Sequence, residues 1–351
     1  MTRNPSWTYR KSGVDLGQIR NLHNSVERAF SSTHKERAGK IGEVISGVGH
    51  YAGLIKIGNR VLALHTDGVG SKVIIAQEMR KFSTIGIDCI AMNVNDIICM
   101  GAEPLAAVDY IALRQANEKL VAEISKGLAE GAKQASISIV GGETAILPEI
   151  IQGEGKNAFD LAASCVGIAD EDKTILNRKM NAGDVIIGLT SSGIHSNGLT
   201  LARKVLRKRH ILREKVFDSK DSLGETLLTP TKIYSRAVFK ALQKHEGISG
   251  LAHITGGAFT KLSRLTRGRN IGFDLADLPR PPPIFDLIQE EGGIKRSEMY
   301  RTFNMGIGFC VISRPSAVSR IVDSFDQDGI SASRIGKLIR VPGVFLDGKR
   351  I

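Results

Sequence analysis

A two-domain α/β (α+β) protein is the fold class that the sequence predicts. The chain has 351 residues, more than one compact hydrophobic core of ordinary size accommodates. Hydrophobic residues make up 42%, and the 38 glycines often stand where an apolar, strand-like run gives way to a helical pattern. The polar stretch 170–184 separates two halves of similar length, so we expect domains over residues 1–172 and 173–351.

The first half opens with a basic, glycine-containing arm through about residue 51, helical near residues 19–30, that can close over a ligand. A hairpin is predicted next, because Gly58 and Asn59 join two strand-like runs and both tolerate the positive φ of a two-residue turn. Its strands are expected at 53–57 and 60–66. The remaining elements are a buried helix, a strand, an amphipathic helix and two strands, at 85–100, 105–113, 117–135, 137–140 and 161–169.

The second half begins with an apolar strand at 185–189, which leads through a glycine-rich turn into a helix near Leu199. A second helix is expected over 231–245, with Pro230 just before its first turn. Prolines at 281–283 predict a stiff link. Strands near 302–312 and 340–345 complete the predicted domain.

Glycine-rich turns are predicted at four strand ends, at 67–72, 141–144, 191–198 and 255–257. Because glycine has no Cβ, backbone N–H groups in such turns can approach an anion closely, and two of the turns open into a helix whose N-terminus favours negative charge. Each turn alone is compatible with a simple structural bend. Together, and interleaved with acids, they favour phosphate binding.

Four acids stand among apolar or small residues, namely Asp67, Asp96, Asp109 and Glu143. Unpaired carboxylates there are costly, and two of them about 4 Å apart repel by roughly 4 kcal/mol at an effective dielectric of about 20. A divalent cation removes that cost, and Mg²⁺ prefers carboxylate and phosphate oxygens. The structural alternatives are a hydrogen bond between Asp96 and Asn93, one turn earlier, and a loop held by Asp109.

His195 and His253 precede small polar and glycine residues, which predicts side chains that project into a cleft. Either can donate to a developing negative charge or move a proton near neutral pH. A packed histidine with one backbone hydrogen bond is the structural alternative for both. Lys72 is expected either to neutralise a phosphate or to form a surface ion pair.

The composition argues against several other classes of protein. No apolar run approaches the length of about 18 residues that a membrane helix needs, and the N-terminal residues lack a secretion signal, so a cytoplasmic protein without membrane association is expected. The four cysteines include no C-x-x-C pair, which favours buried thiols over zinc or disulfides. A net charge of +12 suits anions, but with 5% aromatic residues and no RNA-binding motif we expect no specific nucleic-acid binding.

Eight segments of the chain share the order and spacing of one enzyme family. They are LHTDGVGSK, NVND, MGAEPL, VGGETA, GDVIIGLTSSGIHSNG, LLTPTKIY, AHITGGAF and EMYRTFNMGIGF. Over about residues 9–335 the chain resembles the phosphoribosylformylglycinamidine cyclo-ligases. Sister ATP enzymes such as selenophosphate synthetase and thiamine-monophosphate kinase share the acid-bearing loops, but they leave EMYRTFNMG and LLTPTKIY unexplained.

The resemblance implies the two-domain fold of the cyclo-ligase and selenophosphate-synthetase superfamily, with mixed sheets and an N-terminal domain that pairs into a homodimer. It also implies an ATP-dependent ring closure of formylglycinamidine ribonucleotide to 5-aminoimidazole ribonucleotide, with ADP and phosphate released and Mg²⁺ as the metal. A P-loop is absent from the sequence, so ATP would be bound in another way.

The motifs and the resemblance together assign roles to individual residues. The residues expected to bind ATP and its phosphates are Gly49, Asp67, Gly68, Lys72, Gly141, Gly142 and Glu143. Those expected to hold Mg²⁺ are Asp67, Asp96 and Glu143, and those expected to bind substrate are Ser192, Asn197, Thr255, Gly256 and Gly257. Catalysis is expected from His195, His253 and Asp96. One departure stands at Ala258, where the family usually has a third glycine.

Overall fold

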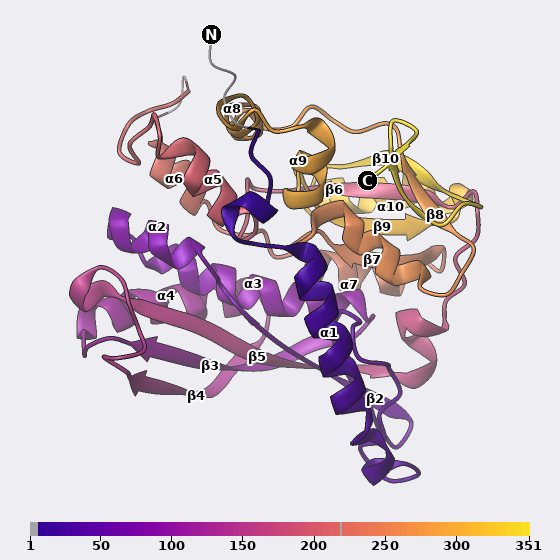
Figure 1. The fold of residues 1–351 in the computed structure, drawn as a ribbon. Helices are drawn as coiled ribbons and strands as arrows, with labels where there is room; N and C mark the ends of the chain where they lie inside the picture. Colours follow the sequence, from indigo (N-terminus) through magenta and orange to yellow (C-terminus); the bar gives the residue numbers. More distant parts are fainter. Residues whose placement is uncertain (1–5, 218–219) are drawn as a thin grey trace.

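The computed structural model describes residues 6–217 and 220–351 and contains two sheets, one from each half of the sequence (Figure 1). The first sheet is five-stranded, in the order β1-β2-β5-β3-β4. Its strands are β1 (Gly53–Ile57), β2 (Arg60–Gly68), β3 (Glu103–Leu113), β4 (Ser138–Ile146) and β5 (Phe159–Asp170). β3 and β4 are parallel while the other pairs are antiparallel, so the sheet is mixed.

Two long helices, α3 (Ser83–Cys99) and α4 (Glu118–Ala135), cover one face of this sheet (Figure 1). α4 begins where the Asn117 side chain accepts a hydrogen bond from the Leu120 amide at 3.3 Å, which satisfies one of the free N–H groups of the first turn. The two helices lie close together because Gly127 faces α3: a Cβ there would lie 1.8 Å from the Ser83 carbonyl oxygen. The arm ahead of the sheet carries α1 (Leu16–Ser31), and α2 (Lys72–Met79) follows β2.

The second sheet is seven-stranded, in the order β12-β11-β8-β10-β6-β9-β7. Its strands are β6 (Val185–Thr190), β7 (Ile248–His253), β8 (Gly272–Leu275), β9 (Ile307–Ser313), β10 (Ala332–Ile339), β11 (Gly343–Leu346) and β12 (Lys349–Arg350). The helices of this half are α5 (Leu199–Leu206), α6 (Leu223–Leu228), α7 (Ser235–Lys244), α8 (Pro283–Gly292), α9 (Arg296–Thr302) and α10 (Val318–Gln327). Within the described residues, no helix has the length and apolar character needed to span a membrane.

Most predicted elements are present, and the strand expected over 340–345 begins at Gly343. The sequence did not predict α2, α6, α8, α9, α10, β8, β10 or β12, and three further expectations are corrected. The segment 141–144 is not a turn, because β4 continues straight through Gly141 and Gly142. Gly142 is required there by a neighbour in β3, since a Cβ would lie 2.2 Å from Asp109 Oδ1. The helix expected from residue 231 begins only at Ser235, and the strand expected from residue 302 begins at Ile307, after α9.

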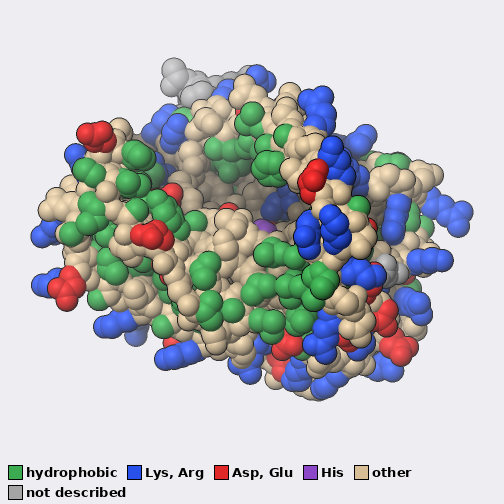
Figure 2. All heavy atoms as spheres, turned by 90° about the horizontal axis from the view of Figure 1, so that it is seen from below, with side chains coloured by type: hydrophobic (Ala, Val, Ile, Leu, Met, Phe, Trp, Pro, Cys, Tyr) green, Lys and Arg blue, Asp and Glu red, His purple; other side chains and the backbone are tan. Residues whose placement is uncertain are grey.

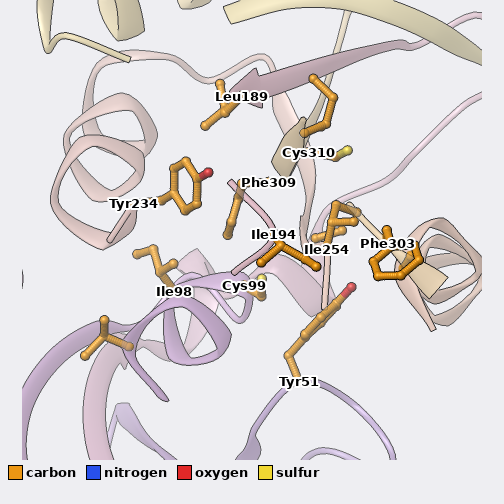
Figure 3. Packing of buried hydrophobic residues seen from close by; sticks show 14 of the residues in the cluster. Tyr51, Ile98, Cys99, Leu189, Ile194, Tyr234, Ile254, Phe303, Phe309 and Cys310 are labelled. Atoms are coloured by element: carbon orange, nitrogen blue, oxygen red, sulfur yellow. The ribbon is translucent and has the colours of Figure 1, made fainter. Parts of the chain in front are cut away.

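The two halves meet through a continuous apolar core. Figure 3 shows Ile98 and Cys99 of α3 below the rings of Tyr234 and Phe309 from the second half. The Tyr234 and Phe309 ring centroids are 5.4 Å apart, and both side chains are fully buried. Figure 3 also shows Tyr51 of the first half pointing toward Ile254 of the second. Polar side chains at this junction are therefore enclosed by both halves.

Candidate active site

The most tightly connected polar group at the junction is the Asp96 carboxylate, near the end of α3. Its Oδ1 accepts a hydrogen bond from His253 Nδ1 at 2.7 Å, and its Oδ2 lies 3.3 Å from His65 Nε2. Only 5% of the Asp96 side chain is exposed. Burial alone would raise the pKa of Asp96, but the bonds from His253 and His65 outweigh it and hold the pKa well below its usual range. Asp96 is therefore an anion in the interior.

His65 lies between the Asp96 carboxylate and the Asn93 side chain. Nε2 faces the Asp96 carboxylate, and Nδ1 lies 3.1 Å from Asn93 Oδ1. That amide oxygen is an acceptor because Asn93 Nδ2 already donates to the carbonyl oxygens of Asp67 and Cys89. Burial would lower the pKa of His65, but Asp96 outweighs it and raises the pKa. The Asp96 carboxylate thus favours the protonated form of His65 at the floor of the site.

His253 is held as a neutral imidazole. Its Nδ1 donates to Asp96, and its Nε2 lies 3.4 Å from the Asn95 amide nitrogen, which donates. Burial lowers the pKa of His253, and the Asp96 hydrogen bond offsets this only in part. Asn95 in turn donates to the Lys232 carbonyl oxygen and accepts from the Tyr234 amide at 2.8 Å. The motif LLTPTKIY, which contains Lys232 and Tyr234, therefore fixes α3 of the first half against the second half.

Asp67 lies at the end of β2 beside this cluster. Its Oδ1 accepts a hydrogen bond from the Gly68 amide at 2.8 Å. Burial raises the pKa of Asp67. The neighbouring Asp96 raises it further, because a second negative charge disfavours ionisation of a carboxyl group. The chemistry of this oxygen-rich, negatively charged pair fits a divalent cation such as Mg²⁺.

Glu143 does not join this pair. It lies on the exposed edge strand β4. Across residues 6–217 and 220–351, no group of three or more His, Cys, Asp or Glu side chains has an arrangement that could hold a metal ion by itself. The structure therefore does not assemble the expected set of Asp67, Asp96 and Glu143 within one chain.

Lys72 was expected either to neutralise a phosphate or to form a surface ion pair, and the structure shows neither arrangement. Its side chain is fully buried, and Nζ lies 2.9 and 2.8 Å from the two carboxylate oxygens of Asp88 and donates to the Thr229 carbonyl oxygen at 2.7 Å. A buried ammonium with these partners forms neither a surface pair nor a free phosphate ligand. Asp88 also accepts from the Thr231 amide and from Ser196 Oγ, at 2.7 and 3.1 Å.

His195 lies in the turn 191–198 with a positive φ of 63° and is 1% exposed. Its Nε2 accepts from the backbone amides of Ser192 and Lys232 at 3.2 and 3.5 Å, so the proton is on Nδ1, which has no partner among the described residues. Burial lowers the pKa of His195 well below its usual value. The expectation that His195 and His253 project into an open cleft is therefore wrong, since both are buried.

The turn 191–198 is held by the motif EMYRTFNMG. Asn304 Nδ2 donates to the Gly193 carbonyl oxygen at 2.9 Å, and Asn304 Oδ1 accepts from Ser191 Oγ at 3.2 Å. A Cβ on Gly198 would lie 2.4 Å from the Phe303 ring. This motif thus positions the turn.

The substrate residues proposed from the sequence lie on two adjacent turns. Ser192 Oγ donates to the Pro230 carbonyl oxygen at 2.6 Å. Asn197 faces the second turn, because a Cβ on Gly256 would lie 3.1 Å from Asn197 Oδ1. Thr255 Oγ1 accepts from Lys261 Nζ, and Gly257 has a φ of 84°. The structure brings these two turns together.

Gly49 and Gly68 complete the expected nucleotide residues. Gly68 is the last residue of β2, next to Asp67. Gly49, with a φ of 103°, lies beside Arg267, whose Nη1 would be 3.6 Å from a Cβ on the glycine. Figure 2 shows a hollow in the molecular face seen from below, with a histidine side chain and lysine or arginine side chains inside it.

Sequence reasoning missed His65, Asn95 and Lys261. The available signal for His65 was its place two residues before Asp67 in LHTDGVGSK, since alternate residues of a strand share a face. Asn95 stands beside Asp96 in NVND, and Lys261 follows the AHITGGAF motif. The contacts of Asn95 with Lys232 and His253, and of Lys261 with Thr255, depend on the tertiary structure and have no signal in the local sequence.

Comparison with known proteins identifies related chains. Residues 49–169 match the family model "AIR synthase related protein, N-terminal domain", and residues 181–349 match its C-terminal counterpart. A phosphoribosylformylglycinamidine cyclo-ligase of Thermococcus gammatolerans is 47% identical over 96% of this chain and 97% of its own. A phosphoribosylformylglycinamidine cyclo-ligase of Pyrococcus furiosus is 48% identical over 96% of this chain and 98% of its own.

A solved structure of ThiL complexed with AMPPCP and TMP has the same fold. Its TM-score is 0.64 at 17% identity, covering 92% of this chain and 93% of that chain. At that identity the likeness concerns the fold alone.

Proposed function

The chain belongs to the phosphoribosylformylglycinamidine cyclo-ligase family, and from this membership we propose that it closes the imidazole ring of formylglycinamidine ribonucleotide at the expense of ATP. The products are 5-aminoimidazole ribonucleotide, ADP and phosphate, and the reaction belongs to purine biosynthesis. The observation that carries the proposal is 47–48% identity to named cyclo-ligases over nearly the whole of both chains.

The reaction joins two steps. The γ-phosphoryl group of ATP activates the formyl oxygen of the substrate, and an internal nitrogen then attacks that carbon as phosphate leaves. Phosphoryl transfer needs positioning and charge neutralisation more than covalent help, so carboxylates, cations and backbone N–H groups suffice. Ring closure gains from holding the two reacting atoms together, which is worth up to about 7–11 kcal/mol in favourable intramolecular reactions.

We assign the turns 191–198 and 255–257 to substrate and phosphate binding, with Ser192, Asn197, Thr255, Gly256 and Gly257 as the contacts. His195 is supported as a hydrogen-bond donor to developing negative charge, because its neutral ring keeps one proton, on Nδ1, which has no partner among the described residues while Nε2 is occupied. His253 is supported as a positioning residue, because both of its nitrogens face protein groups.

Mg²⁺ is proposed as the metal. Asp67 and Asp96 would hold it, because they are neighbouring acids, one half-buried and one buried, with oxygen ligands, and ATP supplies further oxygens. When bound, Mg²⁺ would neutralise charge on the phosphates. Gly49, Gly68 and the strand residues Gly141, Gly142 and Glu143 remain proposed contacts of the nucleotide, with Glu143 reaching it from the exposed strand β4.

A homodimer is proposed through the open face of the first sheet. β4 is an edge strand, and apolar side chains are exposed on this sheet, at Leu64, Leu105, Val108, Tyr110, Ile139, Val140 and Ile146. Figure 2, seen from below, shows hydrophobic side chains on that side of the molecule. A contiguous apolar surface of this kind marks an interaction site. Light scattering of Val108→Lys against wild type tests it, with a monomer expected for the variant.

The remaining assignments concern domains and location. We place the domain boundary near residue 172, between the end of β5 at Asp170 and the start of β6 at Val185. A cytoplasmic location is supported by four free, buried cysteines, since reducing compartments keep thiols unpaired.

The deciding experiment measures ADP and phosphate released from MgATP by purified protein, with and without formylglycinamidine ribonucleotide. The aminoimidazole product is followed by its colour reaction. ADP release that depends on the ribonucleotide and matches product formation is the expected result. ATP binding without product would indicate a sister ATP enzyme, and the absence of ATP binding would contradict an ATP-dependent function.

A further inference from the structure

Three cations lie along one side of the 3₁₀ helix η6 (Ala258–Thr266), which follows the turn 255–257. They are Lys261, Arg264 and Arg267, the last at the C-terminal cap position. A 3₁₀ helix has about 3 residues per turn, so side chains three positions apart lie above one another. We call these three residues the basic row.

The inner end of the basic row reaches the acids of the active site. Lys261 is half-buried, and its Nζ donates to Thr255 Oγ1. Burial lowers the pKa of Lys261. Asp96 and Asp67 act in the opposite direction, and Arg264 lowers the pKa further, so the Lys261 ammonium lies close to both acids and to the next cation of the row. Thr255 is a proposed substrate contact, which places Lys261 beside the reacting groups.

The middle of the row is a guanidinium without an anionic partner. Arg264 is half-buried, with its Cζ 5.7 Å from the ring centroid of Tyr51. Within the part of the chain that the structure describes, it forms no hydrogen bond and no ion pair. Tyr51 Oη, also at this place, is buried without a partner. The Arg264 guanidinium is planar, lies near the Tyr51 ring and has no anionic partner among the described residues. Its N–H donors therefore suit a phosphate group.

The outer end opens to solvent near α1. Arg267 is 66% exposed and pairs with Glu27 of α1 at 3.3 Å. A groove of about 700 Å³ lies there, lined by Asn24, Glu27, Arg28, Ser31 and Arg267. Burial lowers the pKa of His50, and Arg264 and Arg267 lower it further, so the segment that contains Gly49 and His50 runs alongside the row.

We propose that the basic row binds phosphate oxygens of a nucleotide ligand, either the triphosphate of ATP or the 5′-phosphate of the ribonucleotide. Three aligned cations repel one another, and a multiply charged anion removes that repulsion. With a rise of about 2.0 Å per residue, successive cations of the row start about 6 Å apart, so one phosphate contacts two neighbours and a polyphosphate contacts all three. The proposal rests on the proposed function for the identity of the ligand.

Calorimetric titration with sodium tripolyphosphate and, separately, with ribose 5-phosphate tests the row without requiring turnover. Arg264→Gln should weaken binding of the ligand that the row accepts by about tenfold to 100-fold, the range for a lost charged hydrogen bond. The matched control is Arg269→Gln, an exposed arginine just beyond the row, which should bind as wild type does. Equal affinities of wild type and Arg264→Gln for both probes, or no binding of either probe by wild type, would overturn the proposal.

Arg267→Gln provides a second variant, because the Arg267 side chain is 66% exposed. It should weaken tripolyphosphate binding if the row carries a polyphosphate. In the ring-closure assay, an Arg264→Gln enzyme with a raised KM for ATP identifies the triphosphate as the ligand, and a raised KM for the ribonucleotide identifies the 5′-phosphate. If wild type binds the probes through Arg264 but closes no ring, the proposed function fails while the phosphate site stands.

Discussion

His253 Nδ1 donates a hydrogen bond of 2.7 Å to Asp96 Oδ1, joining two residues that are 157 positions apart in the chain. Asp96 belongs to α3 of the first half and His253 to β7 of the second. Because His65 binds the other oxygen of the same carboxylate, Asp96 has one fixed orientation at the junction. The site is therefore complete only when the two halves are packed together.

Replacing the Asp96 carboxylate should abolish turnover. Asp96→Asn keeps the shape but removes the charge that pairs with His65 and the proposed metal. The free energy of unfolding should fall by about 1.5–3 kcal/mol, the value of a hydrogen bond to a charged group, and the variant should stay folded. Steady-state ADP release and urea unfolding measure the two effects, with the exposed Asp172→Asn as the control. Full Mg²⁺-dependent turnover in Asp96→Asn would remove Asp96 from the site.

Replacing His195 should lower turnover more than it weakens ATP binding. The expected fall in turnover comes from loss of the His195 Nδ1–H group, which has no hydrogen-bond partner among the described residues. Asparagine is the suitable replacement, because it tolerates the positive φ of 63° at this position better than alanine does. The measurement compares kcat and KM for ATP of His195→Asn with those of wild type, and an unchanged kcat would exclude a hydrogen bond from His195 to the reacting groups.

Ala258→Gly should stabilise the protein. Ala258 is buried with a φ of 43°, a conformation that costs an L-residue roughly 1–2 kcal/mol and glycine little. Part of this gain is lost to the greater freedom of glycine in the unfolded chain, so we expect a net gain of up to about 1 kcal/mol and a higher Tm. Thermal unfolding measures it. Ala252→Gly in β7, where φ is not positive, is the control and should lower Tm.

The capping box of α6 should make stability depend on acid pH. Glu225 pairs with Lys81 and accepts from the amide and hydroxyl of Ser222, which lowers its pKa from the ordinary 4.5 to about 2. A lowered folded-state pKa gives stability that is present above 4.5 and lost as the pH falls toward 2. Glu225→Gln should thus destabilise the protein at pH 7 but much less near pH 2.

Urea unfolding at the two pH values measures this difference. The exposed Glu246→Gln is a control that should behave like wild type at both. An equal loss of stability in Glu225→Gln at both pH values would show that the carboxylate charge of Glu225 does not stabilise α6.

Local features were determined by the sequence itself. The turn at Gly58-Asn59, the cap at Asn117 and the apolar pattern of α3 act between near neighbours, so their elements were predictable within a few residues. The family motifs likewise placed Asp67, Asp96 and the turns 191–198 and 255–257 near the site. Such signals depend on backbone preference and periodicity, which a single sequence contains.

Only the tertiary structure decided which side chains pair. Lys72 binds Asp88 in the interior, Gly142 makes room for Asp109 inside a strand, and Asp96 lies between two histidines. These contacts form between segments far apart in the chain, and their energies depend on burial by both halves. No local pattern contains that information, because an ionisable side chain has the same spacing signal whether it faces solvent, a ligand or a buried partner.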